Sequence, residues 1–303
     1  MAMKIKKIIA CISVALTATV ALCGCVNQNS YEAASNGTTQ QPKIAATSVA
    51  VMEICQKLDL DLVGVPKSSL TEIPSRYSNA VSLGSPMSPD LELLAQCDPD
   101  WVLSPSSLMS DLKPKYEAAG LQYAFLNLTS VQGMYKSISQ MGDIFNREEE
   151  AQKLVDDFLK FYNSYKDSHK GKKSPQVLIL MGLPGSYVVA TENSYVGSLV
   201  ELAGGTNVYS GTDDEFLNVN TEDMLKKDPD IILRTAHAMP DSVKEMFAEE
   251  FKSNDIWKNF RAVNKNQVYD LPYESCGMSA NFRYQEALSA IDNILYAQNV
   301  DLK

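Results

Sequence analysis

Histidine is scarce in this sequence: His169 and His237 are the two among 303 residues. A zinc or manganese site built from side chains needs three or four histidine or carboxylate ligands, and this chain cannot provide several imidazoles. Common catalytic signatures are also missing, because no GxGxxG, Walker loop, HExxH or GxSxG motif is present. A nucleophile–histidine–acid triad would have to use one of these two residues. The sequence therefore gives no support for an enzyme.

Paired cysteines and an excess of positive charge are missing as well. Cys55, Cys97 and Cys276 are the cysteines that follow the N-terminal 25 residues, and no CxxC or CxxCH pattern contains them. Neither a disulfide framework, a zinc ribbon nor a covalent haem attachment is indicated. Without residues 1–24 the chain has 24 basic and 37 acidic side chains, a formal net charge of −13. This charge argues against a nucleic acid as partner.

The N-terminus has the layout of a lipoprotein signal peptide. Three lysines precede an apolar stretch, 8–22, that is too short to span a bilayer comfortably. The stretch ends in Leu-Cys-Gly-Cys, which resembles a lipobox whose cleavage leaves Cys25 to carry lipid. An ordinary secretory signal or a short anchor are the alternatives. We expect a signal peptide over 1–24 and a protein attached by lipid to the extracytoplasmic face of the cell membrane.

Residues 25–42 are polar and nearly free of large apolar side chains, and they predict a flexible tether. About 260 residues follow, which is large for one core and comfortable for two lobes.

A repeat at a constant offset of 130 residues indicates two similar lobes. DLELLAQCDPDWVL (90–103) and NTEDMLKKDPDIIL (220–233) each predict a helix, a turn broken by proline and a buried strand. Asp90 and Asn220 are suitable N-caps for the two helices. Strand-like runs surround both copies, at 43–48, 62–65, 80–83, 123–126, 176–182, 187–190, 207–210 and 267–271.

The segment 131–170 between the two copies predicts a linking helix. From Asn146 onward, an Asn cap with a glutamate three residues later and apolar residues at helical spacing favour a helix. His169 lies at its charged end, where a solvated helix terminus is expected. The fold class is therefore α/β, with Rossmann-like parallel-sheet lobes over 43–130 and 171–303. A single long helix joins these lobes, and a ligand cleft lies between them.

Met87 and His237 stand out as a pair of metal ligands from different lobes. His237 follows the strand of the second copy, and Met87 lies between Pro86 and Pro89 ahead of the first copy's helix. Each proline fixes its own φ and restricts the residue before it, so the methionine is held stiffly. A thioether and an imidazole suit porphyrin iron better than a hard cation. Met87 could instead be core packing, and His237 could cap a helix beginning at Pro240.

The loops expected to wall the cleft are apolar and small, which suits a flat macrocycle: 47–51, 63–66, 181–185 and 276–281. The expected pocket residues are Thr47, Ser48, Val49, Val65, Pro66, Lys67, Arg76, Leu183, Cys276 and Met278. Haem would bring two carboxylates, which need local positive or donor groups. The candidates are Lys67, Arg76, Arg234 and backbone N–H groups around Thr47 and Ser48.

Across roughly 43–300 the chain resembles the ABC-transporter substrate-binding proteins that have a helical backbone between two α/β lobes. More narrowly, it is similar to the haem-binding lipoproteins of the iron-regulated surface determinant type. The resemblance rests on GSPMSPDLELLAQCDPDWVLS, VGSLVELAGGTNVY, NTEDMLKKDPDIILRTAHAMP and CGMSANF. The AGGTN and Glu…DPD elements belong to a wider superfamily that includes siderophore and cobalamin binders. The methionine of the first stretch and the histidine of the third are more specific, and the resemblance implies that Met87 and His237 are axial ligands of haem iron.

The resemblance also implies a function without catalysis. The chain would capture haem b (iron protoporphyrin IX) and deliver it to an ABC permease for iron uptake, with an upstream haem-donor surface protein as a further partner. Glu92 and Glu222, one per lobe, would meet arginines of the permease, although the helix dipole alone favours acids in a first turn. A siderophore or corrinoid (cobalamin) receptor on the same scaffold is the alternative. A haem enzyme fits less well, because axial Met and His leave the iron no open position.

Overall fold

The computed structural model describes residues 41–68 and 71–296. Its strands are β1 (Ile44–Ala46), β2 (Leu62–Val65), β3 (Val81–Ser82), β4 (Gly84–Ser85), β5 (Ser88–Pro89), β6 (Trp101–Pro105), β7 (Tyr123–Leu126), β8 (Gln176–Leu183), β9 (Ser186–Ala190), β10 (Thr206–Asn207), β11 (Phe216–Leu217), β12 (Ile231–Ala236) and β13 (Val268–Asp270). Its α-helices are α1 (Val49–Lys57), α2 (Leu91–Cys97), α3 (Met109–Ala118), α4 (Val131–Phe145), α5 (Glu148–Ser168), α6 (Tyr195–Leu202), α7 (Thr221–Lys226), α8 (Pro240–Ser253), α9 (Arg261–Asn264), α10 (Tyr273–Cys276) and α11 (Tyr284–Tyr296).

The predictions for the signal peptide, for Cys25 and for nearly all of the tether lie outside the described residues. Within 41–68 and 71–296, no helix combines the length and the hydropathy that a membrane span requires.

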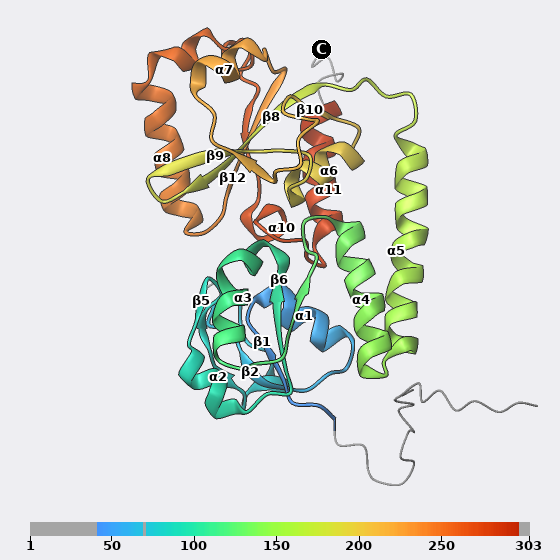
Figure 1. Cartoon of the computed structure of the whole chain (residues 1–303). Helices are drawn as coiled ribbons and strands as arrows, with labels where there is room; N and C mark the ends of the chain where they lie inside the picture. Colours follow the sequence, from blue (N-terminus) through green and yellow to red (C-terminus); the bar gives the residue numbers. More distant parts are fainter. Residues whose placement is uncertain (1–40, 69–70, 297–303) are drawn as a thin grey trace, which may run out of the picture. The chain divides into compact units, whose positions relative to one another are not determined.

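The first lobe is built on a parallel sheet in the order β3-β2-β1-β6-β7 (Figure 1). Helices α1 and α3 connect neighbouring strands of this sheet, as parallel pairing requires a crossover. The central strand β1 is buried at every residue, which fits its Ile-Ala-Ala sequence. Because the strands are parallel, their carboxyl ends lie along one edge, and the loops that follow them gather there.

The second lobe has a mixed sheet rather than the purely parallel one expected from the sequence. Strands β8, β12, β13 and β10 pair in parallel, whereas β9 pairs antiparallel with β8 and β11 pairs antiparallel with β9. The reason is the connection between β8 and β9, which has only two residues, Pro184 and Gly185. A connection this short makes a hairpin, because a parallel neighbour needs a crossover of a dozen or more residues. Gly185 supplies the positive φ, +82°, that the turn requires.

The repeat predicted from the sequence is confirmed at the level of individual hydrogen bonds. The side chains of Asp90 and Asn220 accept backbone N–H groups in the first turns of α2 and α7. At the other ends of these helices, Asp98 and Asp228 both have a φ of 46°. The left-handed conformation ends each helix, and the proline that follows prevents it from resuming.

The last aspartate of each repeat attaches the incoming strand of its own sheet. Asp100 accepts the backbone N–H of Lys43 at 2.7 Å, and Asp230 accepts that of Gln176 at 2.9 Å. In both lobes the aspartate's own N–H donates to the carbonyl of the same partner residue at 2.8 Å. Arg261 also binds Asp230, at 2.6 Å. The repeated aspartate therefore anchors the start of an equivalent strand in each lobe, β1 or β8.

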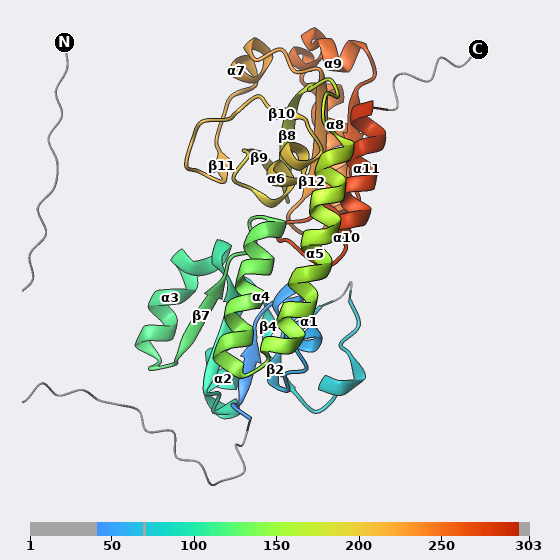
Figure 2. The same ribbon diagram turned by 90° about the vertical axis from the view of Figure 1, so that its right-hand side faces the viewer.

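Two helices, α4 and α5, make up the connecting segment, and they lie side by side (Figures 1 and 2). The 21 residues of α5 form the long helix expected there. The predicted capping box at Asn146 is wrong, because this residue ends α4 in the left-handed conformation with φ 53°. Asparagine tolerates this conformation better than other non-glycine residues, and the C-cap position therefore prevails over the N-cap.

Aromatic rings join the connecting helices to the C-terminal helix. Tyr135 of α4 stacks on Phe158 of α5 with centroids 4.2 Å apart, and Tyr284 of α11 meets both rings edge-on at 6.0 Å. The largest apolar core continues from this junction into both sheets, with members such as Ile44 and Ile231. One core thus runs through both lobes and the helices between them.

His169 does not lie at a solvated helix terminus, as the sequence had suggested. Its side chain is 7% exposed. Its Nε2 lies 2.8 Å from a carboxylate oxygen of Asp292, and its Nδ1 lies 2.7 Å from the carbonyl oxygen of Tyr165. Both partner atoms are hydrogen-bond acceptors for the ring nitrogens. The pair of His169 and Asp292 ties α5 to α11, a contact between residues 123 positions apart that periodicity cannot predict.

Candidate ligand-binding site between the lobes

Met87 and His237 come from different lobes and meet. The Sδ atom of Met87 lies 3.4 Å from the Nε2 atom of His237. His237 directly follows β12, and its backbone N–H donates to the Gly182 carbonyl of the neighbouring strand β8 at 2.9 Å. Met87 stands in the turn between β4 and β5 of the first lobe. The structure therefore brings together the two residues singled out by the sequence, and we call this place the Met87–His237 site.

The hairpin that carries Met87 is short and well anchored. Strands β4 and β5 pair antiparallel through Ser85 and Ser88, with Pro86 and Met87 as the turn. The Lys67 N–H donates to the carbonyl of Gly84 at 2.8 Å, which ties the hairpin to the loop after β2. The Met87 side chain is 53% exposed, so it is not part of a core. The interpretation of Met87 as core packing is therefore wrong.

His237 has the electronic state that a metal ligand needs. Burial lowers the pKa of its imidazole below the ordinary value of 6.5, so the ring is neutral at neutral pH. Its Nδ1 is buried and has no hydrogen-bond partner within the described residues. The ring is not a helix cap, because α8 begins at Pro240 with Met239 as its N-cap residue.

The loops after β1 and β6 provide hydrogen-bonding groups whose roles are structural. Thr47 is 1% exposed, and its hydroxyl lies 2.8 Å from that of Ser104. Ser48 caps α1 by accepting the N–H of Val51. Val49, the first residue of α1, is half-buried. The amino end of α1 thus opens at the carboxyl end of β1, with Ser48 as its cap.

The remaining predicted pocket residues differ in accessibility. Val65 is 3% exposed and Cys276 fully buried, whereas Leu183 and Met278 are half-buried. Burial raises the pKa of the Cys276 thiol to about 12, so it carries no charge at neutral pH. Pro66 is also buried. Leu183 ends β8 and follows Gly182, which bonds to His237, so it is the pocket residue that the strand register places nearest to His237.

Neither of the two arginines considered for ligand carboxylates is available. Arg76 donates to Asp61 at 2.8 Å and also binds Asp59, and both aspartates precede β2 at the amino edge of the sheet. The expected place of Arg76 near the rim of the cleft is therefore wrong. Arg234 binds both oxygens of Asp270, at 2.7 and 2.8 Å. These partners lie 15 to 36 positions away, so local sequence patterns could not reveal them.

Lys67 is the basic candidate that stays accessible. Its side chain is exposed, and it has no ion pair within residues 41–68 and 71–296. Since it follows β2 by two residues, it lies at the same edge as the amino end of α1.

A model of the periplasmic binding protein family matches residues 44–274. This match covers most of the chain. The chain belongs to the periplasmic binding protein family.

Among periplasmic binding proteins, the chain is 40% identical over 291 residues to the high-affinity heme uptake system protein IsdE of Staphylococcus aureus, covering 96% of this chain and 98% of IsdE. The crystal structure of S. aureus IsdE complexed with heme superposes with a TM-score of 0.81 and 42% identity, covering 85% of this chain and all of that one. An ABC transporter substrate-binding protein from Listeria monocytogenes superposes with a TM-score of 0.80 and 49% identity, covering the same shares. These relatives are transport proteins, and the expectation that the chain is not an enzyme is confirmed.

Glu92 and Glu222 occupy equivalent places in the two lobes of this periplasmic binding protein. Each is the second residue of its helix, α2 or α7, and each side chain is exposed. Within the described residues neither carboxylate takes part in an ion pair. Both therefore remain available for a partner.

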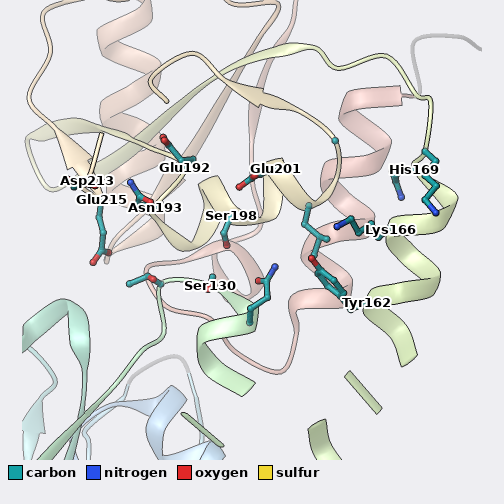
Figure 3. A pocket seen from close by; sticks show the side chains of 15 residues that line it. Ser130, Tyr162, Lys166, His169, Glu192, Asn193, Ser198, Glu201, Asp213 and Glu215 are labelled. Atoms are coloured by element: carbon teal, nitrogen blue, oxygen red, sulfur yellow. The ribbon is translucent and has the colours of Figure 1, made fainter. Parts of the chain in front are cut away.

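A hollow of about 760 Å³ lies between the connecting helices and the second lobe (Figure 3), and neither Met87 nor His237 lines it. One wall carries Tyr162, Lys166 and His169 of the connecting segment. The opposite wall carries acidic residues that include Glu192 and Glu201 (Figure 3). None of the pocket residues predicted from the sequence lines it. Its mixed charges do not suit an apolar macrocycle.

One residue of the Met87–His237 neighbourhood was not anticipated. Met239 follows His237 by two positions and is 58% exposed. The sequence signal was its position before Pro240, where a helix would ordinarily begin with Ser, Thr, Asp or Asn.

Proposed function

We propose that the chain captures haem on the extracytoplasmic side of the membrane and delivers it to an ABC permease. The observation that carries the proposal is the meeting of Met87 Sδ and His237 Nε2 across 150 residues of sequence. The relative named as a heme uptake protein, with which the chain shares 40% identity, supports the same ligand.

The donor set suits porphyrin iron. A thioether and a neutral imidazole are soft and intermediate ligands, and such a pair holds low-spin haem in electron-transfer proteins. Metal bonds to imidazole nitrogen and to sulfur are about 2.0–2.3 Å long, so a bridging iron needs the two atoms about 4.4 Å apart. They lie 3.4 Å apart. A shift of about 1 Å at the hairpin of Met87 would meet this requirement.

Capture and handover follow from this coordination. With both axial positions filled by protein, the iron offers no open site for oxygen or peroxide. The two ligands come from separate lobes, so displacing either ligand lowers the affinity for haem. A permease that pulls the Met87 hairpin or the second lobe would therefore release its cargo.

The haem carboxylates would be received at the carboxyl edge of the first sheet. Lys67 supplies an unpaired positive charge there. The first N–H groups of α1, next to Ser48 and Val49, add the positive end of a helix dipole. Arg76 and Arg234 do not take part, because aspartates hold both.

The partners follow from the two exposed carboxylates and from the N-terminus. Glu92 and Glu222 would each bind arginine on one half of the permease, and lipid on Cys25 would keep the protein near it. An upstream surface protein would supply haem. The excess of acidic over basic side chains argues against a nucleic acid as partner.

A ligand titration tests the function. Protein beginning at residue 26 is titrated with haemin, with ferric siderophores and with cobalamin, and optical spectra and competition are recorded. We expect a shifted Soret band and low-spin haem at micromolar concentration, with no displacement by the other two ligands. A protein that binds a siderophore or cobalamin but not haemin would contradict the proposal.

A further inference from the structure

Met239 departs from several local preferences for backbone conformation and helix capping. Its φ of 50° and ψ of 58° are left-handed, a conformation that costs a residue with a side chain about 1–2 kcal/mol. It precedes Pro240, which further restricts its backbone. It also occupies the N-cap of α8, yet makes no side-chain hydrogen bond there. When several local preferences fail at one residue, a functional role is the usual reason.

The side chain held in this conformation is presented rather than buried. Met239 is 58% exposed, and His237 lies two residues before it. Met109 is 46% exposed and Met87 53%. Met87 lies in the turn after β4, Met109 begins α3, and Met239 follows β12 by three positions. Met239 therefore presents an exposed thioether two residues after His237, one of the two members of the Met87–His237 site.

We propose that Met239 is a second contact residue for the haem, packing its thioether on the porphyrin beside His237 and slowing release. This inference rests on the proposed haem-binding function. Iron stays with Met87 and His237, and Met239 contributes apolar area and a polarisable sulfur to the aromatic ring. The backbone strain at Met239 is the cost of directing its side chain outward, and contact with the ligand offsets it.

Release kinetics provide the test. Haem-loaded protein is mixed with an excess of an apo-globin that scavenges haem, and the rate of transfer is followed optically. We expect Met239→Ala to speed release by about tenfold, as expected when roughly half of a buried methionine's apolar contact is lost. Met239→Leu, which keeps the apolar area, should stay within about threefold. The low-spin spectrum should not change in either variant, because neither substitution touches an axial ligand.

A glycine variant separates contact from folding. Met239→Gly removes the strain, so the haem-free protein should melt about 2 °C higher while releasing haem faster. The control is Leu159→Ala, an exposed apolar residue on α5, which should leave the release rate unchanged.

Three results would overturn the inference while the proposed function stands. The first is wild-type release rates in Met239→Ala, and the second is loss of the low-spin spectrum in Met239→Leu. The third is an effect of Met239→Ala on transfer to the permease alone, which would make Met239 a partner contact. Failure of the wild-type protein to bind haemin would instead overturn the function itself.

Discussion

The sulfur of Met87 approaches the ring nitrogen of His237 to 3.4 Å, although the two residues come from different lobes. A metal that takes one ligand from each lobe has a coordination that depends on the relative position of the two lobes.

Removing either ligand should change the iron in a distinct way. His237→Ala should weaken haemin binding by more than about 100-fold, since even outer-shell partners of metal ligands are worth 10–100-fold. Met87→Leu keeps the apolar shape but removes the sulfur, so it should give five-coordinate or water-ligated iron with faster release. Optical and magnetic circular dichroism spectra check both. Spectra identical to wild type in both variants would refute the ligand assignment even if haem bound.

Haem affinity should depend on pH through His237. Because burial lowers its pKa below 6.5, the neutral ring that ligates iron persists into mildly acidic solution. Affinity should therefore be constant above pH 6.5 and fall only below the lowered pKa, where a proton competes with iron. Soret titrations from pH 8 to about pH 5 measure this dependence. The residual binding of His237→Ala should lack it, and a steady decline beginning above neutrality would contradict the prediction.

Lys67 and Arg76 offer a matched pair of basic residues. Lys67→Ala should weaken haemin binding by about three- to fivefold, the upper range for one exposed ion pair. Arg76→Ala should leave haem affinity within about twofold, because Asp59 and Asp61 hold this guanidinium at the far edge of the sheet. Fluorescence quenching by haemin gives both affinities. Equal effects of the two substitutions would rule out this placement of the haem carboxylates.

The two exposed glutamates should matter for delivery and not for binding. Reversing both charges, with Glu92→Lys and Glu222→Lys, should abolish haem-dependent stimulation of the permease ATPase in vesicles. Haemin affinity of the free protein should stay at the wild-type value. Glu149→Lys, an exposed acid on α5, serves as the charge control. Normal stimulation by the doubly reversed variant would exclude these residues from docking.

The aspartate of the second repeat should stabilise the fold. Asp230→Ala leaves the N–H of Gln176 unpaired and removes a partner of Arg261, so the free energy of unfolding should fall by about 1–3 kcal/mol. Although burial opposes it, hydrogen bonds from Gln176 and Arg261 lower the pKa of Asp230. A lowered carboxyl pKa gives stability that is present above the unfolded value and is lost as pH falls through the acid range. Urea unfolding at neutral and acidic pH measures this loss, with exposed Asp143→Ala as the control. An equal loss of unfolding free energy in Asp230→Ala and Asp143→Ala would show that Asp230 stabilises the fold no more than an exposed aspartate does.

Features encoded over short distances were predictable from the sequence. The repeated DPD motif acts within each lobe, and its caps at Asp90 and Asn220 depend on residues two or three positions away. Strand positions followed from runs of apolar residues, and Met87 was recognisable from the prolines around it. The family resemblance then supplied the ligand, which neither spacing nor composition could identify.

Features that depend on distant partners were not predictable. Arg76 and Arg234 looked available because their aspartates lie on other elements. His169 looked solvated because Asp292 is 123 positions away. Asn146 is a local exception, because asparagine suits both the start of a helix and a left-handed helix end, and its φ of 53° makes it the C-cap of α4.

The packed rings of Tyr135, Phe158 and Tyr284 have a mechanical consequence. An interior that runs without interruption through both lobes resists any wide hinge, since opening would pull apart closely packed aromatic surfaces. Cargo exchange must then rely on small, local movements, such as that of the two-residue turn that bears the exposed side chain of Met87.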